Sequence, residues 1–173
     1  IAGWSEQLVR KMSVALHIGD EVIEVDGQPV AGDLRTFIYR LSEPGSPIRL
    51  TIRKQPNALF FSLVKPIRSA TPIGIILHKN KNRIESIEED SIAWRRGLPS
   101  LVPSLVDATI LVPAVITDIN ERRLNLWARN NQVFRRLAQL RDGCEFSLVL
   151  QPHDFIKALK HAVRVQTRHF KAY

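Results

Sequence analysis

The stretch Leu16-His-Ile-Gly-Asp-Glu-Val-Ile-Glu-Val-Asp-Gly-Gln-Pro-Val30 holds two turn signals with a short apolar segment between them. Ile18-Gly19-Asp20 predicts a turn, because glycine supplies an unusual dihedral angle and aspartate bonds back to the chain. Residues 22–25 predict a strand. Asp26-Gly27 is the strongest short hairpin signal in the chain. The stretch therefore predicts a turn, a strand and a hairpin that returns the chain at its end.

After this stretch the apolar positions change their period. From Leu34 to Leu41 they lie at i, i+3, i+4 and i+7, which predicts a two-turn helix with Asp33 as its N-cap. Over residues 48–53 apolar and polar side chains alternate, which predicts a half-buried strand. The first third of the chain therefore reads as strand, turn, helix and strand.

The same order recurs further along the chain. We predict strands over 59–64, 73–78 and 83–87, a helix over 91–97 stopped by glycine, a strand over 115–120, a helix over 131–140 and a strand over 146–150. The last three repeat the pattern of residues 22–26, 34–41 and 48–52. An internal repeat of this kind indicates two copies of one α+β module.

The stretch at 16–30 resembles the fourth strand of the PDZ family, and the likeness continues through 34–41 and 48–53. In the second copy, Pro72-Ile73-Gly74-Ile75 resembles that family's carboxylate-binding loop. Residues 91–98 resemble the short helix before its fourth strand. Two such domains with a short linker and a following helical segment are similar to the arrangement in the syntenin and Mint adaptor families.

This resemblance implies an α+β fold of two PDZ-like modules, each a small, partly open barrel or sandwich capped by two helices. The expected divisions are module 1 over residues 1–54, a linker over 55–58, module 2 over 59–152 and a basic helical tail over 153–173. Module 1 lacks its first strands and its carboxylate loop. Module 2 carries an insertion over 99–113, which we expect to be an apolar loop that is buried or bound to a partner.

The resemblance also implies a function, which is a scaffold that binds C-terminal peptides by β-strand addition. The residues it implicates are Arg68, Pro72, Ile73, Gly74, Ile75, Ile76, Leu77, Asn130, Phe134 and Leu137. The loop would capture the terminal carboxylate through its N–H groups, with help from Arg68. The strand would pair with the peptide, and Ile73, Phe134 and Leu137 would line the pocket for its last side chain.

Two parts of this site have open alternatives. The first helical position, which reads the ligand, is Asn130, or Arg129 or Asn131 if the alignment slips. The plainer interpretation of the site is that Gly74 is only a loop glycine, with Phe134 and Leu137 in the core.

Charge is unevenly distributed along the chain, whose formal net charge is +8. Residues 1–56 hold 7 Lys/Arg and 7 Asp/Glu, whereas residues 153–173 hold 5 against 1. The tail reads as an amphipathic helix, with Phe155, Ile156, Leu159 and Val163 on one face and basic side chains off it. It packs on module 2, or it contacts acidic phosphoinositides through Lys157, Lys160, Arg164 and Arg168. The alternative function is thus a membrane-surface or oligomerisation module whose groove is degenerate.

Several function classes are disfavoured. The single cysteine, Cys144, allows no internal disulfide and fits a reducing compartment, so we expect a cytoplasmic protein, peripheral at membranes under the alternative. The five histidines show no metal spacing, so we expect no metal, no cofactor, no catalytic residues and no enzyme activity. Aromatic residues are only 7% of the chain, which argues against nucleic acid. No apolar stretch approaches the ~20 residues of a membrane span.

The expected partners are therefore the C-terminal tails of membrane or signalling proteins, with oligomerisation as an alternative. A third interpretation is a regulatory fragment of a larger enzyme. It follows from the missing initiator Met, which predicts a fragment or a processed product.

Overall fold

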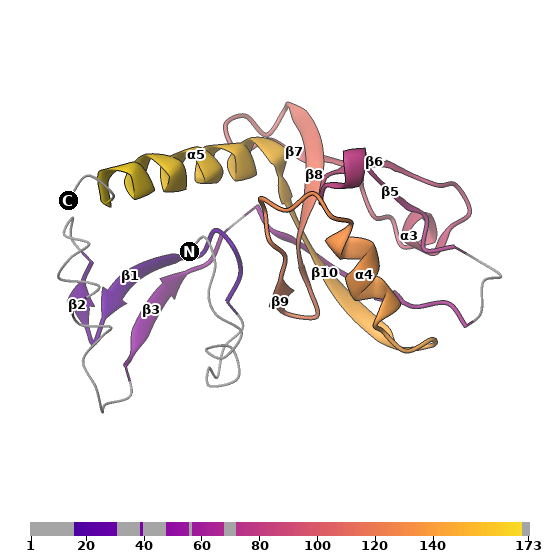
Figure 1. The fold of residues 1–173 in the computed structure, drawn as a ribbon, viewed down its shortest axis with the longest axis horizontal. Coiled ribbons are helices and arrows are strands. Elements are labelled where there is room, and N and C mark those ends of the chain that lie inside the picture. Colours follow the sequence, from indigo (N-terminus) through magenta and orange to yellow (C-terminus); the bar gives the residue numbers. More distant parts are fainter. Residues whose placement is uncertain (1–15, 31–38, 40–47, 56, 68–71, 171–173) are drawn as a thin grey trace.

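The computed structural model describes residues 16–30, 39, 48–55, 57–67 and 72–170, with the side chains of 166–170 excepted (Figure 1). Its strands are β1 (Glu21–Val25), β2 (Gln28–Pro29), β3 (Leu50–Arg53), β4 (Leu59–Val64), β5 (Ile75–Leu77), β6 (Ile84–Ile87), β7 (Leu101–Pro103), β8 (Leu111–Ile119), β9 (Arg122–Arg123) and β10 (Glu145–Pro152). Its helices are the 3-10 helix η1 (His78–Asn80), α3 (Ile92–Arg95), α4 (Gln132–Ala138) and α5 (His153–Phe170). The helix predicted over 34–41 lies outside the described residues except for Tyr39, and so does Arg68.

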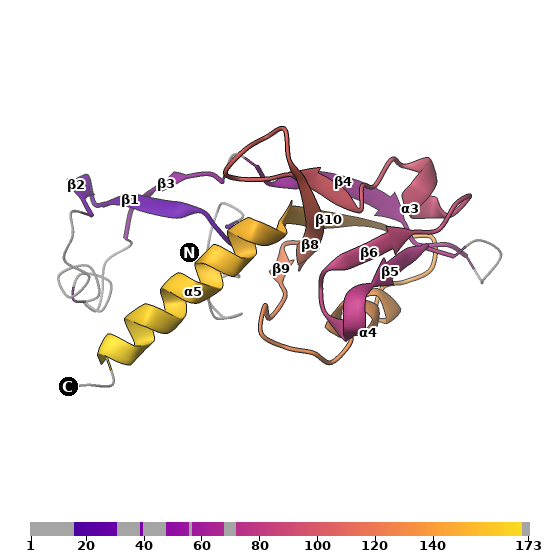
Figure 2. The ribbon, with the colours of Figure 1, turned by 90° about the horizontal axis from the view of Figure 1, so that it is seen from above.

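The strands form antiparallel sheets. A small sheet has the order β2-β1-β3, and a larger one has the order β4-β10-β8-β7 with β9 paired to β8. β5 and β6 form a third, two-stranded sheet that a bridge between Arg83 and Val115 joins to β8. The larger sheet curls and carries α3 and α4, while α5 leaves its end toward the small sheet (Figures 1 and 2). The α+β class expected from the sequence is confirmed.

The main core fills the curl of the larger sheet. Phe146, Leu148 and Leu150 point inward at alternate positions of β10, as the period of a strand requires, and Leu63 and Ile116 meet them from the neighbouring strands. Ala93 of α3 and Val133 and Leu137 of α4 close the cluster. The helices therefore lie where they do because their apolar faces complete this core.

The hairpin predicted at Asp26-Gly27 is confirmed. Val25 pairs with Gln28 across the turn, and the two turn residues have φ of 50° and 76°. Positive φ at both central positions is what a two-residue turn between right-twisted strands requires.

The second turn of this kind follows β8, and its hydrogen bonds repeat those of the first. The Asp26 N–H donates to the Arg49 carbonyl at 2.8 Å, and the Arg49 N–H donates to Asp26 Oδ1 at 2.8 Å. Asn120 and Ser147 exchange the same two bonds, at 3.0 and 2.8 Å. The sheet orders β2-β1-β3 and β9-β8-β10 also match. The repeat seen in the sequence therefore has a counterpart in local geometry.

The insertion over 99–113 is a hairpin, not the loop we expected. β7 pairs with the start of β8, so that Val102 faces Val112 and is buried. Asp154 anchors the connection by accepting from Ser104 Oγ at 2.5 Å and from the Leu105 N–H at 3.1 Å. The prolines misled the prediction, because proline is compatible with an edge strand whose N–H groups face away from its partner. Its apolar side chains remain exposed in part, above all Val106 at 90%.

The first segment meets the rest of the protein at the turn formed by Ile18-Gly19-Asp20. Leu16 and Ile18 form a second apolar cluster with Val115 of β8, with Leu126, and with Ile156 of α5. The Gln151 side-chain amide donates to the Ile18 carbonyl. A Cβ on Gly19 would lie 2.7 Å from the Phe155 ring, so this turn fits closely against α5. None of the helices in the described ranges has the length and hydropathy to cross a bilayer.

Candidate functional site

Gly74 lies in the loop that precedes β5, and two independent constraints require glycine there. Its φ is +80°, a conformation that side chains rarely adopt. A Cβ at this position would lie 2.1 Å from both Cβ and Oγ of Ser91. Ser91 is buried and cannot easily move, because its hydroxyl caps α3 by accepting from the Trp94 N–H and donates to the Glu88 carbonyl at 2.6 Å.

Three successive backbone carbonyls of the loop accept hydrogen bonds from α3 and from Glu88. Those of Pro72 and Ile73 accept from the N–H groups of Ile92 and Ala93, at 3.2 and 3.0 Å, and that of Gly74 accepts from Glu88 at 2.9 Å. In a trans peptide plane the N–H points opposite to the carbonyl. The N–H groups of residues 73, 74 and 75 are therefore directed away from α3 and β6. Within the described residues, neither Ile73 nor Gly74 donates to a backbone carbonyl.

The free edge of β5 continues from these groups. Within the described part of the chain β5 pairs only with β6, with Ile75 opposite Ile87. The Glu88 N–H donates to the Gly74 carbonyl, so these two residues form a hydrogen-bonded pair. Bonded and non-bonded pairs alternate along an antiparallel ladder, so the next pair, Ile75 and Ile87, is non-bonded. The N–H and carbonyl of Ile75 therefore face outward. The edge is short, since β5 ends at Leu77.

The side chains along this segment alternate between the core and the surface. Ile75 is buried in the main cluster, and Ile73 and Leu77 are half-buried against it. Pro72 is exposed, and so is Ile76, at 40%. A strand added at this edge would therefore lie beside the Ile76 side chain.

The helix opposite begins later than expected. α4 starts at Gln132, with Asn131 as N-cap in the left-handed region at φ 53°, so the expected position Asn130 is exposed and outside the helix. The cause is tertiary. Gln132 Oε1 accepts from the Asn125 N–H at 2.9 Å, and its Nε2 donates to Asn82 Oδ1 at 2.9 Å. The side chain of Gln132, the first residue of α4, is therefore hydrogen-bonded within the fold.

The predicted pocket residues divide into core and surface. Leu137 is buried in the main cluster, which is the plainer of the two interpretations for this residue. Phe134 is 43% exposed and lies outside the buried part of that cluster. The Asn131 N–H donates to the Asn80 carbonyl at 3.4 Å, which ties the start of α4 to η1.

A hollow of about 350 Å³ lies between the end of β4 and α3. Its walls include Ile67, Ile92 and Arg95, and none of the predicted pocket residues lines it. Lys65 also lines the hollow, and its Nζ donates to the Leu140 carbonyl at 2.6 Å and pairs with Asp142 at 3.1 Å. This hollow is not the pocket that the sequence predicted.

A second hollow, of about 190 Å³, is strongly basic. We call it the basic pocket, and it is lined by Lys81, Asn82, Arg83, Val115, Leu126, Trp127, Ala128, Arg129, His153, Ile156, Lys157, Lys160 and Arg164. Of the residues expected to contact lipid, Lys157, Lys160 and Arg164 share this site, while the Arg168 side chain lies outside the described atoms. Sequence reasoning did not find Lys81, Arg83, Arg129 and His153 as members of this site. They lie on three separate segments that come together only in the fold. Only the spacing 153, 157, 160 and 164 marks a common face in the sequence.

Partial burial and neighbouring cations lower the pKa of two groups in the basic pocket. Partial burial holds the pKa of His153 below its usual range, and the charges of Arg83, Lys160 and Lys157 add to this, against the opposing effect of Asp154. Partial burial likewise lowers the pKa of Lys160, with contributions from Arg164, Lys81 and Arg129. The Lys160 ammonium lies 5.9 Å from the centre of the Trp127 ring.

Replacing His153 by Gln is expected to flatten the pH dependence of stability below neutrality. Because the folded pKa of His153 is depressed, the unfolded chain binds the proton more readily. The free energy of unfolding is therefore highest above 6.5, the ordinary pKa of histidine, and it falls as the pH drops from there through the folded pKa of His153. Urea unfolding at a series of pH values should show a smaller loss for H153Q than for the wild type. His161→Gln, at an exposed position of the same helix, is the control and should leave the loss unchanged.

Within the described ranges no group of three or more His, Cys, Asp and Glu side chains could hold a metal ion. The single cysteine, Cys144, is exposed. It directly follows Gly143, whose φ is 76°, and precedes the first residue of β10, so it belongs to the turn and not to the strand.

Comparison with known proteins gives a limited set of likenesses. No protein-family model matches the chain, and no curated protein matches it. Among solved structures, the PDZ domain from a choanoflagellate GIPC, bound to GAIP peptide, is similar at 23% identity and a TM-score of 0.38. The likeness covers 55% of this chain and 89% of that one. A second structure of the same choanoflagellate PDZ domain gives the same values.

Proposed function

We propose that the chain is a PDZ-like binding module that takes the C-terminal end of a partner polypeptide at residues 72–77. The observation that carries the proposal is the loop itself, in which three bonded carbonyls direct three successive N–H groups to the opposite side. Such a run of amides forms a small nest for an anion. The terminal carboxylate of a peptide is an anion of the right size.

The adjoining edge of β5 supports strand addition as the mode of binding. The outward N–H and carbonyl of Ile75 would pair with the incoming backbone, as an added strand pairs with a sheet edge. β5 ends at Leu77, so the contact would involve only the last few residues of the ligand. A half-buried Ile73 beside the nest favours an apolar last side chain.

The wider role that we propose is that of a scaffold for the tails of membrane or signalling proteins. The repeated hydrogen bonds of Asp26 with Arg49 and of Asn120 with Ser147 support a second, incomplete module of the same kind in the first segment. That segment would add no groove of its own. The basic pocket favours the alternative function, a membrane-surface module that contacts acidic phosphoinositides.

The test of peptide binding compares one peptide set in two chemical forms. Peptides ending in a free carboxylate should bind, and the same peptides with a C-terminal amide should bind at least about tenfold more weakly, because a charge-assisted hydrogen bond is lost. Fluorescence anisotropy with the full chain measures both. Equal binding of the two forms would contradict the proposal.

A matched pair of variants at Ile76 places the ligand. Ile76 is exposed on β5, so both Ile76→Glu and Ile76→Lys leave the core untouched. The negative side chain should weaken binding of the free-acid peptide, and the positive one should retain or strengthen it. Identical affinities for the two variants would place the peptide elsewhere.

A further inference from the structure

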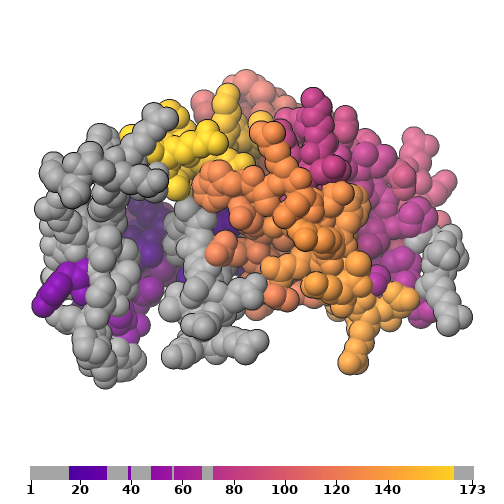
Figure 3. Space-filling model, viewed as in Figure 1, coloured from indigo at the N-terminus to yellow at the C-terminus, as the bar shows by residue number. Residues whose placement is uncertain are grey.

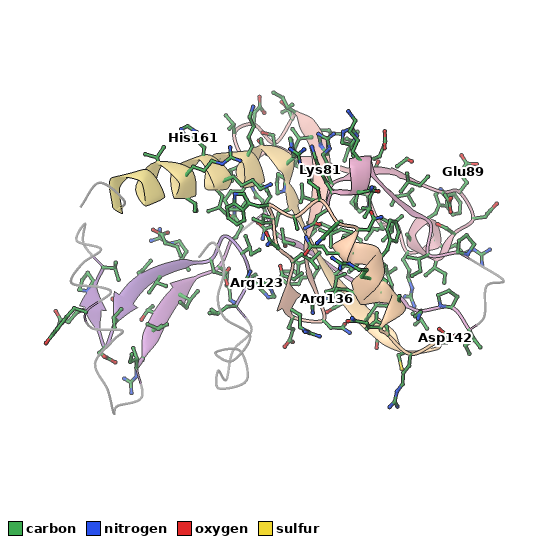
Figure 4. The ribbon with its side chains drawn as sticks, in the orientation of Figure 1. Lys81, Glu89, Arg123, Arg136, Asp142 and His161 are labelled. Atoms are coloured by element: carbon green, nitrogen blue, oxygen red, sulfur yellow. The ribbon has the colours of Figure 1, made fainter. Side chains whose placement is uncertain are left out.

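The charged residues of the basic pocket come from three segments that are far apart in the sequence. One wall is the turn over 81–83 between η1 and β6, a second is the loop over 126–129, and the third is one face of α5. In the space-filling view α5, in yellow, lies against the orange residues of that loop (Figure 3). Lys81 lies beside the start of α5, whereas His161 lies further along the helix (Figure 4).

The lining of the pocket is rich in positive charge. Its lining holds the six basic residues Lys81, Arg83, Arg129, Lys157, Lys160 and Arg164 together with His153, and no Asp or Glu. The ion pairs within the described residues include Arg53 with Glu21, Lys54 with Asp20 and Lys65 with Asp142. In the part of the chain that the structure describes, none of the ion pairs involves Lys81, Arg83, Arg129, Lys157 or Lys160. Like charges held this close repel one another, and an anion between them relieves the repulsion.

A buried donor without a partner lies in the same wall. Asn82 is only 6% exposed, and its Oδ1 accepts from Gln132 Nε2 at 2.9 Å, which fixes the orientation of the amide. Its Nδ2 is buried and has no hydrogen-bond partner among the described residues. Buried polar groups are normally hydrogen-bonded, so this amide is a donor available to an acceptor placed in the pocket.

The size and the donors of the pocket select the class of ligand. At about 190 Å³ it is smaller than the roughly 300–1,000 Å³ pockets that enclose drug-sized ligands. It therefore accommodates a compact charged group whose remainder stays outside. A phosphate monoester carries close to two negative charges and three strong acceptor oxygens, against one charge for a carboxylate, and so matches several cations and an amide donor better.

We propose that the basic pocket is a binding site for a phosphate-monoester group, in particular for a small polyol that carries several such groups. The guanidinium and ammonium groups around the rim would hold the phosphate oxygens, and Asn82 Nδ2 would donate to one of them. The ligand is either a free polyol phosphate or the same group as a lipid headgroup. This site is separate from the loop at residues 72–77 and does not depend on the peptide proposal.

The experiment uses the full chain and two forms of one headgroup. Isothermal titration measures binding of soluble inositol trisphosphate, and co-sedimentation measures binding to phosphatidylcholine vesicles with and without a bisphosphorylated phosphoinositide. Binding in solution without vesicle binding assigns a free ligand. Vesicle binding that the soluble headgroup displaces assigns the lipid. No binding of either form at low salt would overturn the proposal.

Matched variants distinguish a built site from diffuse charge. Lys160→Gln should weaken binding by about tenfold or more, since it removes a charged hydrogen-bond donor. Asn82→Asp keeps the acceptor for Gln132 and should weaken binding further, because it turns a negative charge toward the ligand. Arg135→Gln removes the same charge from the exposed surface of α4 and should change affinity less than about twofold. An equal loss for R135Q and K160Q would mean that only net charge matters, which would overturn the site.

Two further readouts make the result independent of folding and of the peptide groove. An anion in the pocket should raise the pKa of His153, followed by the NMR shifts of its imidazole across a pH titration, because a negative charge favours the protonated ring. An unchanged His153 titration in the presence of saturating ligand would place the ligand elsewhere. Ile76→Glu should leave phosphate binding unaltered, so the two proposed sites can fail separately.

Discussion

Replacing Gly74 by alanine is expected to lower the free energy of unfolding by about 3 kcal/mol or more, a large fraction of the 5–15 kcal/mol typical of a domain. The new methyl group would need to lie 2.1 Å from the Ser91 side chain, which is buried and hydrogen-bonded on both sides. Relief by shifting α3 would break the bonds that Ile92 and Ala93 make to the loop. Overpacking of this kind adds to the strain of a positive φ. Urea unfolding followed by circular dichroism measures the loss.

Gly97→Ala is the matched control for this change. Gly97 ends α3 with φ +68°, and a Cβ there would meet nothing within 4 Å. It therefore reports the backbone strain alone, about 1 kcal/mol. The excess of G74A over G97A measures the contact with Ser91. If the two variants were equally stable, the loop would not be seated against α3 in solution.

The sequence predicted those parts of the fold that depend on local chemistry. The hairpin at Asp26-Gly27 and the strand over 59–64 are found at the expected residues, because turn dihedrals and side-chain alternation act over a few positions. The family resemblance marks Gly74 as a candidate for binding a carboxylate. The structure adds a reason that no sequence pattern carries, since Ser91 is 17 residues away and touches it only in the fold.

The features that escaped prediction depend on residues distant in the chain. The start of α4 is displaced to Gln132 because the side chain bonds to Asn82 and to the Asn125 backbone. The insertion forms a hairpin because Asp154, some 50 residues later, anchors Ser104. The basic pocket unites three segments, and only the α5 face had a visible pattern. Spacing along the chain holds no information on such contacts until the sheet and α5 are in place.

Ile156→Ala is expected to lower the free energy of unfolding by about 2–4 kcal/mol, the range for removing a buried aliphatic side chain. Ile156 is 3% exposed and packs with Leu16, Ile18, Val115 and Leu126. It thus joins the start of α5 to β8 and to the first segment in one cluster. Val165→Ala on the same helix removes an aliphatic side chain that is 40% exposed, and it should change stability by no more than about 0.5 kcal/mol. Urea unfolding of the two variants gives the comparison.

The same substitution connects the apolar cluster with the basic pocket. Ile156 forms part of the pocket wall, and its packing holds Lys157 and Lys160 opposite Lys81 and Arg83. Loosening this end of α5 should therefore weaken phosphate binding in I156A although no charge has changed, whereas V165A should bind as the wild type does. A stable, fully binding I156A would show that α5 is not held by this cluster. A normal V165A beside a weakened I156A would show that the position of the helix, and not merely its charge, makes the pocket.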